Sequence, residues 1–205
     1  MIYWRDELLA NESLLMIALA IVLALIVALV VYFVGIYNGL VGLRENIKVA
    51  WANIDVLLKQ RHDELAKLIE TCKRYMQFEQ ETLEKVMRAR ASISQASTSG
   101  NIAAVGAAEQ QLRAGVGRLF AVAENYPQLK SDENFKQLQS RITSLEESIA
   151  DRRELYNDQV NLNNIRINVF PDLMIAQRYG FACAHLLEFA DNEKSDPNLS
   201  RLFTA

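Results

Sequence analysis

The hydrophobic pattern of the chain is dominated by one run near its start, from Leu14 to Val34. The run has 21 residues and contains no charge, proline or glycine. A hydrocarbon core about 30 Å thick is crossed by roughly 20 apolar residues that rise about 1.5 Å each. Four amphipathic aromatic residues lie near its two ends: Tyr3, Trp4, Tyr32 and Tyr37. The pattern predicts a transmembrane helix over 14–34, because the core helices of soluble proteins rarely stay apolar all round for this length.

A cleaved signal peptide is the main alternative for this run. The leading segment 1–13 has one Arg against three acidic residues, and the apolar core exceeds the roughly 7–15 residues typical of signal peptides. No cysteine follows the run, which disfavours a lipoprotein anchor. Arg5 precedes the run, whereas Arg44, Lys48, Lys59 and Arg61 follow it. This bias places residues 1–13 outside and the rest of the chain in the cytoplasm.

The next segment, 36–93, has apolar residues at three-and-four spacing, which predicts an amphipathic helix. No proline interrupts it, and about 58 residues would extend roughly 85 Å as one helix. A helix of that length is either broken somewhere or part of an extended bundle. The turn-forming residues of 94–101 are expected to end it.

Three more helices follow in the pattern. A helix over 101–126 should be the weakest, because each of its three glycines costs about 1 kcal/mol relative to alanine where exposed; Pro127 should stop it. A helix over 131–170 starts at a Ser131-Asp132-Glu133 cap, and Pro171 ends or kinks it. A final helix covers 172–189, before a polar tail over 191–205.

The 131–170 segment has the most regular spacing of the chain. Its three-and-four positions are apolar in the first half and polar in the second: Phe135, Leu138, Ile142, Leu145, Ile149, Arg152, Tyr156, Gln159, Asn163, Arg166 and Phe170. Such a repeat predicts lengthwise packing against another helix. Alternatively, Val160, Ile165 and Ile167 let the apolar face rotate along the helix.

The predicted fold is therefore all-α. A single N-terminal transmembrane helix precedes an elongated antiparallel bundle of about four helices, the first of them very long, over residues 35–190.

Composition excludes several functional classes. The net charge of −3 gives no basic excess for nucleic acid, and two cysteines cannot build a disulfide scaffold. Cys72 and Cys183 are expected to be packing thiols without a histidine partner. His62 and His185 have no metal-ligand spacing, so no metal, cofactor or catalytic residue is predicted.

Polar residues on or beside the apolar stripes are the candidates for structural pairing: Asp55, Arg61, Glu79, Arg90, Arg152 and Asn163. Buried charges must pair or cost several kcal/mol each, and we hypothesise a Glu79–Arg152 pair that fixes register. The alternative is partly exposed, snorkelling side chains. Gly35 and Gly39 permit close helix approach near the membrane exit, as an oligomer contact or a hinge. Trp51 is a further candidate for a contact between copies.

Several motifs resemble the LemA family in order along nearly the whole chain. They are Tyr37-Asn38-x-Leu40-Val41-x-Leu43-Arg44, Ala50-Trp51-x-x-Ile54-Asp55-Val56-x-Leu58-Lys59-x-Arg61-x-Asp63, Ala89-Arg90-Ala91, Ala123-Glu124-x-Tyr126-Pro127-x-Leu129-Lys130, Phe135-x-x-Leu138-Gln139, Arg153-x-x-Tyr156-Asn157-x-x-Val160, Phe170-Pro171 and Ala176-x-x-x-Gly180-Phe181. The chain departs from the family pattern at Glu64-Leu65, where Ile-Pro is usual, at Phe78-Glu79 and at Leu162-Asn163. The missing proline favours a continuous long helix.

The resemblance implies a bacterial, single-span, helical-bundle protein without established enzymatic activity. Some relatives shape or organise internal membranes, and family genes often neighbour those for membrane zinc proteases. We therefore expect a non-enzymatic, homo-oligomeric scaffold in the bacterial inner membrane, with the lipid bilayer as its partner. The alternative is an adaptor for a membrane protease or another membrane complex.

Overall fold

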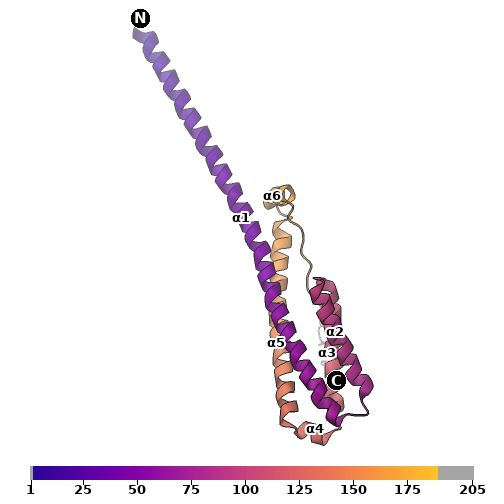
Figure 1. Cartoon of the computed structure of the whole chain (residues 1–205). Coiled ribbons are helices and arrows are strands. Elements are labelled where there is room, and N and C mark those ends of the chain that lie inside the picture. The colour runs from indigo at the N-terminus through magenta and orange to yellow at the C-terminus, as the bar shows by residue number, and fades with distance from the viewer. Residues whose placement is uncertain (1, 189–205) are drawn as a thin grey trace, which may run out of the picture. The chain divides into compact units, whose positions relative to one another are not determined.

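Helices are the only regular secondary structure in the residues that the structure, a computed structural model, describes: the backbone of 2–188 and the side chains of 15–188. Six helices follow in order (Figure 1): α1 (Ile2–Tyr75), α2 (Gln80–Thr98), α3 (Ile102–Ala123), α4 (Pro127–Ser131), α5 (Glu133–Arg166) and α6 (Asp172–Tyr179). The all-α prediction is confirmed. The side chains of Tyr3 and Trp4, and the predicted polar tail 191–205, lie outside the described residues.

Helix α1 joins the predicted transmembrane segment to the first part of the predicted long helix without a break. It stays helical through Glu64 and Leu65. The 36–93 segment is nevertheless broken, as one of the two alternatives held, because the chain reverses at residues 76–79. Met76 remains fully buried while the turn brings Leu83 onto the same core. The apolar spacing continues across this turn, so spacing alone could not reveal it.

The contacts divide the chain into two units, and the larger one is a helical bundle. It comprises 46–162 and 183–188 of the described residues, with α1 from residue 46, α2, α3, α4 and most of α5. Tyr75 of α1 donates a hydrogen bond to Asp132 at 3.0 Å, and the Trp51 ring packs on Tyr156 at 5.9 Å between centroids. From the first pair to the second, the position on α1 moves back toward the N-terminus, while the position on α5 moves forward by the same number of residues. The two helices are therefore antiparallel, as predicted.

The core of the bundle consists of apolar side chains from these helices. Its fully buried members include Ile54, Leu65, Leu68, Cys72, Met76, Val86, Val105, Leu119, Leu129, Ile142 and Val160. Burial of one such Leu or Ile side chain contributes about 1.5–3 kcal/mol. This shared core holds the bundle together.

Helix ends show where local sequence signals succeed and fail. Asp132 accepts a hydrogen bond from the Phe135 amide at 3.1 Å, which confirms the predicted cap of α5. Helix α2 continues to Thr98 and so includes the first five residues of the segment expected to end it; the chain then reverses through Gly100, whose φ is +67°. Pro127 does not stop α3 but opens α4, because the first helical position needs no N–H donor.

In the second half of α5, the strict repeat holds at Tyr156 and Asn163, which are both buried, but the rest of the packed face shifts by one residue, as the alternative interpretation held. Val160 is fully buried, whereas Arg152, which the strict repeat places on the packed face, is exposed. Ile167 is buried and Ile165 is exposed, so the rotation uses two of the three residues expected to allow it.

The smaller unit combines 2–45 of α1 with 163–182. Four buried residues form its core: Ile36, Leu40, Ile167 and Ala176. Asp172 accepts a bond from Arg166 at 2.6 Å and joins the end of α5 to the start of α6. Helix α6 ends at Tyr179 because Gly180 adopts a left-handed φ of +71°, so the predicted continuation of this helix beyond Tyr179 is wrong.

Residues 183–188, which belong to the bundle unit, are not helical and lie against α5 and α3. Tyr156 donates to the His185 carbonyl at 2.9 Å, and Asn157 bonds both backbone groups of Leu187, at 2.9 and 3.2 Å. Gly106 allows this close approach, because a Cβ there would clash with the Glu188 carbonyl oxygen. By contrast, nothing lies within 4 Å of a Cβ built on Gly117.

We predict opposite effects for two alanine substitutions in α3. Gly106→Ala should lower the free energy of unfolding by about 1–3 kcal/mol, because the 183–188 segment must move. Gly117→Ala should raise it by up to about 1 kcal/mol through helix propensity alone. Chemical denaturation followed by circular dichroism measures both, and equal effects would contradict the close contact of Gly106.

Candidate functional site

The apolar stretch of α1 is one candidate functional element. The helix is long and apolar enough to cross a membrane, and none of its most apolar 18-residue window is buried. Side chains such as Leu15, Leu25 and Val31 are each at least 65% exposed. In water this surface would be unfavourable, and a soluble core helix would bury it. The described residues therefore contain one candidate membrane span, in the N-terminal part of α1 (Figure 1).

The two glycines after the span have different surroundings. A Cβ on Gly35 would meet nothing within 4 Å, so this position is open. A Cβ on Gly39 would lie 2.9 Å from Nη1 of Arg166. Gly39 thus makes room for the Arg166 guanidinium, which pairs with Asp172. This contact lies within one chain and is not a contact between copies.

A buried ion pair links α1 and α3 inside the bundle. The guanidinium of Arg61 donates to the Glu109 carboxylate, and both residues are more than 95% buried. Burial raises the pKa of Glu109, an effect that Arg61 opposes. Removing one partner would leave an uncompensated charge in a dry environment, so the pair couples the positions of the two helices.

Two more carboxylates surround this pair. Glu64 of α1 accepts from Lys67 at 3.1 Å and lies 3.5 Å from Arg141 of α5. Glu146 of α5 is half-buried, and burial raises its pKa although Arg61 and Arg113 lower it. Three buried atoms have no hydrogen-bond partner in the structure: one carboxylate oxygen of Glu64, one carboxylate oxygen of Glu146, and Nε of Arg61. We call Arg61, Glu64, Glu109 and Glu146 the charge cluster.

The hypothesised Glu79–Arg152 pair is wrong. Glu79 lies in the α1–α2 turn and is 3.5 Å from the hydroxyl of Tyr126, which donates to it. The turn lies near the start of α5, since Tyr75 bonds Asp132. Arg152 is 19 residues after Glu133, roughly 28 Å along the helix, and is exposed.

Three other residues that were predicted to form polar pairs each have a hydrogen-bond partner within the chain. Asp55 accepts from Lys59 at 2.6 Å and from Ser97 of α2 at 2.5 Å, and these bonds lower its pKa. Arg90 of α2 donates to the His62 carbonyl at 2.9 Å. Asn163 is buried, and its side-chain amide donates to the Ala182 carbonyl at 3.4 Å. Trp51 is partly buried against Tyr156, so its ring packs within the chain.

The chemistry available to these groups is limited. Among the side chains that the structure describes, those of residues 15–188, no group of three or more from His, Cys, Asp or Glu could hold a metal ion. Burial raises the pKa of Cys72 to about 12, so its thiol is a poor nucleophile, whereas Cys183 is exposed. The pKa of His62 is lowered by burial and by Arg90.

Sequence reasoning identified Arg61 but missed the three carboxylates of the charge cluster. Glu109 interrupts the buried positions Val105, Leu112 and Val116 of α3 at helical spacing. A search for charges within every apolar stripe, and not only that of the long helix, would have found it.

Comparison with known proteins identifies the family. The LemA family model matches residues 50–200. The chain belongs to the LemA family. It is also similar to a protein named LemA from Metamycoplasma hominis, with 26% identity over 174 residues that cover 83% of this chain and 77% of the relative.

Magnetosome proteins form the second group of relatives. MamQ 1 and MamQ 2 of Paramagnetospirillum magneticum are each 24% identical over 177 residues, which cover 74% of this chain and 64% of each relative. This LemA-family chain therefore spans less than two thirds of the length of these relatives.

We predict that Glu146→Gln stabilises the protein at pH 7. An acid with a raised folded pKa binds more protons in the folded than in the unfolded state at pH values between the two pKa values. Stability therefore falls as pH rises from about 4.5 through the raised pKa, and the penalty persists above it. Glutamine removes this penalty, so the gain should vanish below pH 4.5. Urea unfolding at pH 4 and pH 7 measures it, and Glu147→Gln, at an exposed neighbour, should change stability by less than about 0.5 kcal/mol.

A double-mutant cycle tests the buried pair. Glu109→Leu alone should cost about 3–5 kcal/mol, because it leaves Arg61 charged and buried. The double variant with Arg61→Met should be more stable than either single variant. Additive single effects in urea unfolding would show that the two side chains do not depend on each other.

Proposed function

We propose that this LemA-family protein is a membrane-anchored, non-enzymatic scaffold that assembles with copies of itself and organises or shapes the bacterial membrane. The observation that carries the proposal is α1: one unbroken helix contains both a fully exposed apolar stretch and one wall of the helical bundle. A tether of this kind holds a bundle at a bilayer without any need for chemistry.

Exposed apolar positions on the bundle favour self-assembly. Val49 and Val56 lie seven residues apart on α1 and are 61% and 53% exposed. Leu155 and Leu162 have the same spacing on α5 and are also exposed. A seven-residue apolar repeat is the pattern by which helices pair lengthwise.

The relatives support a general role at membranes, without specifying what that role is. MamQ 1 and MamQ 2 are named magnetosome proteins, and a magnetosome is a membrane organelle. We transfer from them only the association with membrane organisation. The proposed placement of the bundle in the cytoplasm depends on the flanking Lys and Arg residues alone.

A second candidate function is an adaptor for a membrane protease or another membrane complex. The observation that favours it is the α1–α2 turn, where Phe78 is 94% exposed beside a groove lined by Met76, Leu83 and Met87. A stoichiometric second protein that co-purifies with the chain through this turn would favour the adaptor over the scaffold.

We predict that the full chain stays in the membrane pellet after alkaline carbonate treatment, and that it forms oligomers in mild detergent whose mass light scattering measures. Val49→Glu with Val56→Glu should reduce the mass to that of a monomer, because it places like charges along the repeat. Met87→Glu, at an exposed position on α2, is the matched control and should leave the mass unchanged. A native chain that is monomeric at every concentration would refute self-assembly.

A further inference from the structure

The end of α5 and the following helix α6 expose a group of large apolar side chains. We call residues 165–179 the α5–α6 corner. Five of its side chains are more than half exposed: Ile165, Val169, Phe170, Met174 and Tyr179. Phe170 is the most exposed of them, at 74%. Such a concentration within 15 residues is more than the scattered apolar residues of an ordinary surface, and indicates a contact.

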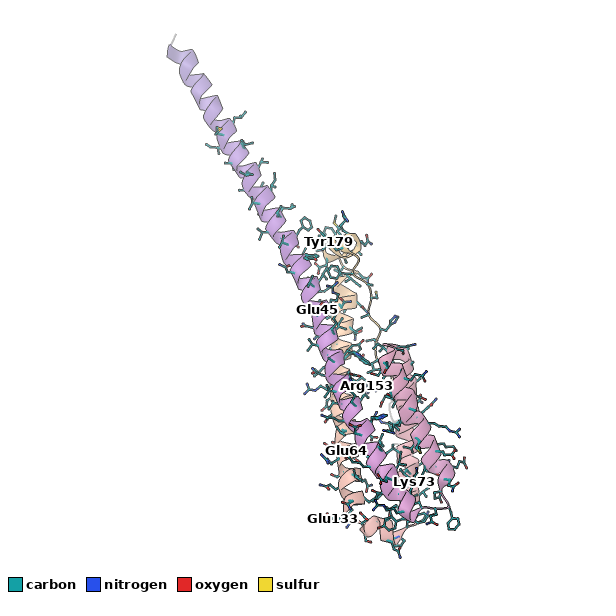
Figure 2. All side chains as sticks on the ribbon, viewed as in Figure 1. Glu45, Glu64, Lys73, Glu133, Arg153 and Tyr179 are labelled. Atoms are coloured by element: carbon teal, nitrogen blue, oxygen red, sulfur yellow. The ribbon has the colours of Figure 1, made fainter. Side chains whose placement is uncertain are left out.

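The corner is attached to α1 directly after the apolar stretch. Ile167 and Ala176 are buried against Ile36 and Leu40 of α1. The Tyr179 ring packs on Tyr37 with 4.9 Å between centroids. Figure 2 shows Tyr179 beside α1, with the apolar part of that helix continuing past it. These contacts all lie within the smaller unit.

The position of these contacts along α1 sets their depth. Ile36 and Leu40 lie two and six residues after Val34, or roughly 3 and 9 Å along the helix axis. A bilayer of about 40–45 Å with a hydrocarbon core of about 30 Å has a headgroup layer of about 5–8 Å on each side. When residues 14–34 cross the core, the contact at Ile36 therefore lies within the headgroup layer, and the contact at Leu40 lies at the outer boundary of that layer.

The side chains of the corner suit that layer. Tyr37 and Tyr179 present rings with polar tips, which favour the boundary between hydrocarbon and water. The Arg178 guanidinium lies 6.0 Å from the Tyr179 ring, and that of Arg44 lies 5.6 Å from the Phe181 ring. These two cations stand beside apolar groups, where they can bind lipid phosphates.

We propose that the α5–α6 corner is a second membrane contact, which inserts Phe170 and Met174 into the headgroup layer of the bilayer that α1 crosses. The inference rests on the proposed anchoring by α1 and adds to it a surface that the hydrophobic run does not include. Lipid is the occupant because the corner is continuous with the membrane-spanning part of α1.

Fluorescence quenching in liposomes tests this contact with the full chain. Met174→Cys in a Cys183→Ser background carries an environment-sensitive NBD label, and Cys72 stays unlabelled because it is fully buried. The liposomes contain phosphatidylcholine and phosphatidylglycerol, with a nitroxide near the top of the acyl chain in half of the samples. We expect the lipid nitroxide to lower the emission at least about two-fold, and aqueous iodide to quench weakly.

The matched control is the same label at Phe78→Cys, which is exposed and apolar but belongs to the bundle unit. There we expect quenching by iodide and none by the lipid nitroxide. Phe170→Ser in the chain labelled at residue 174 should weaken the lipid quenching, whereas Phe78→Ser should not. A label at Val169→Cys repeats the test if the first labelled chain loses its helical circular dichroism.

The outcomes separate this inference from the proposed function. If carbonate leaves the chain in the liposome pellet but the lipid nitroxide quenches neither residue 174 nor residue 169, the corner does not touch lipid and the anchor stands. Shielding of both labels from lipid and iodide alike would mean that protein covers the corner, which overturns the inference. Release of the chain by carbonate would instead refute the anchor.

Discussion

The structure depends on how the surface of α1 changes along its length. Between Leu14 and Val34 the helix is apolar on every side, and beyond Val34 only one face is apolar. The first condition is stable in lipid, and the second needs other helices to cover the apolar face. Ile54, Leu58, Leu65, Leu68 and Cys72 form the covered stripe in the bundle.

The buried charges impose a second constraint on the bundle. An apolar core alone tolerates sliding of one helix along another, since many positions of Leu and Ile are nearly equivalent. The Arg61–Glu109 pair does not, because a shift of one turn would separate two charges that have little access to water. Two further carboxylates extend this constraint to α5. Glu64 of α1 pairs with Arg141 of α5, and Glu146 of α5 interacts electrostatically with Arg61.

Periodicity predicted the helices well because each has a buried stripe, and the Asp132 cap was readable from local sequence. It could not locate the α1–α2 turn, since Met76 and Leu83 continue the stripe without proline or glycine between them. The Glu79–Arg152 pair failed for a related reason. Choosing a partner for a charge requires the register between helices, which depends on where the chain turns. The last helix was predicted to end too late, because the apolar residues around Gly180 suggested a continuous helix. They did not reveal that Gly180 adopts a left-handed backbone conformation.

The α5–α6 corner lies at one end only of the apolar stretch of α1. If its side chains occupy the headgroup layer, they add area to one leaflet and none to the opposite leaflet. A bilayer relieves such an imbalance by curving, so that the leaflet with more area lies on the convex side. Many copies side by side would sum these small wedges into curvature, which gives a geometric route from a short helix to the outline of a membrane compartment.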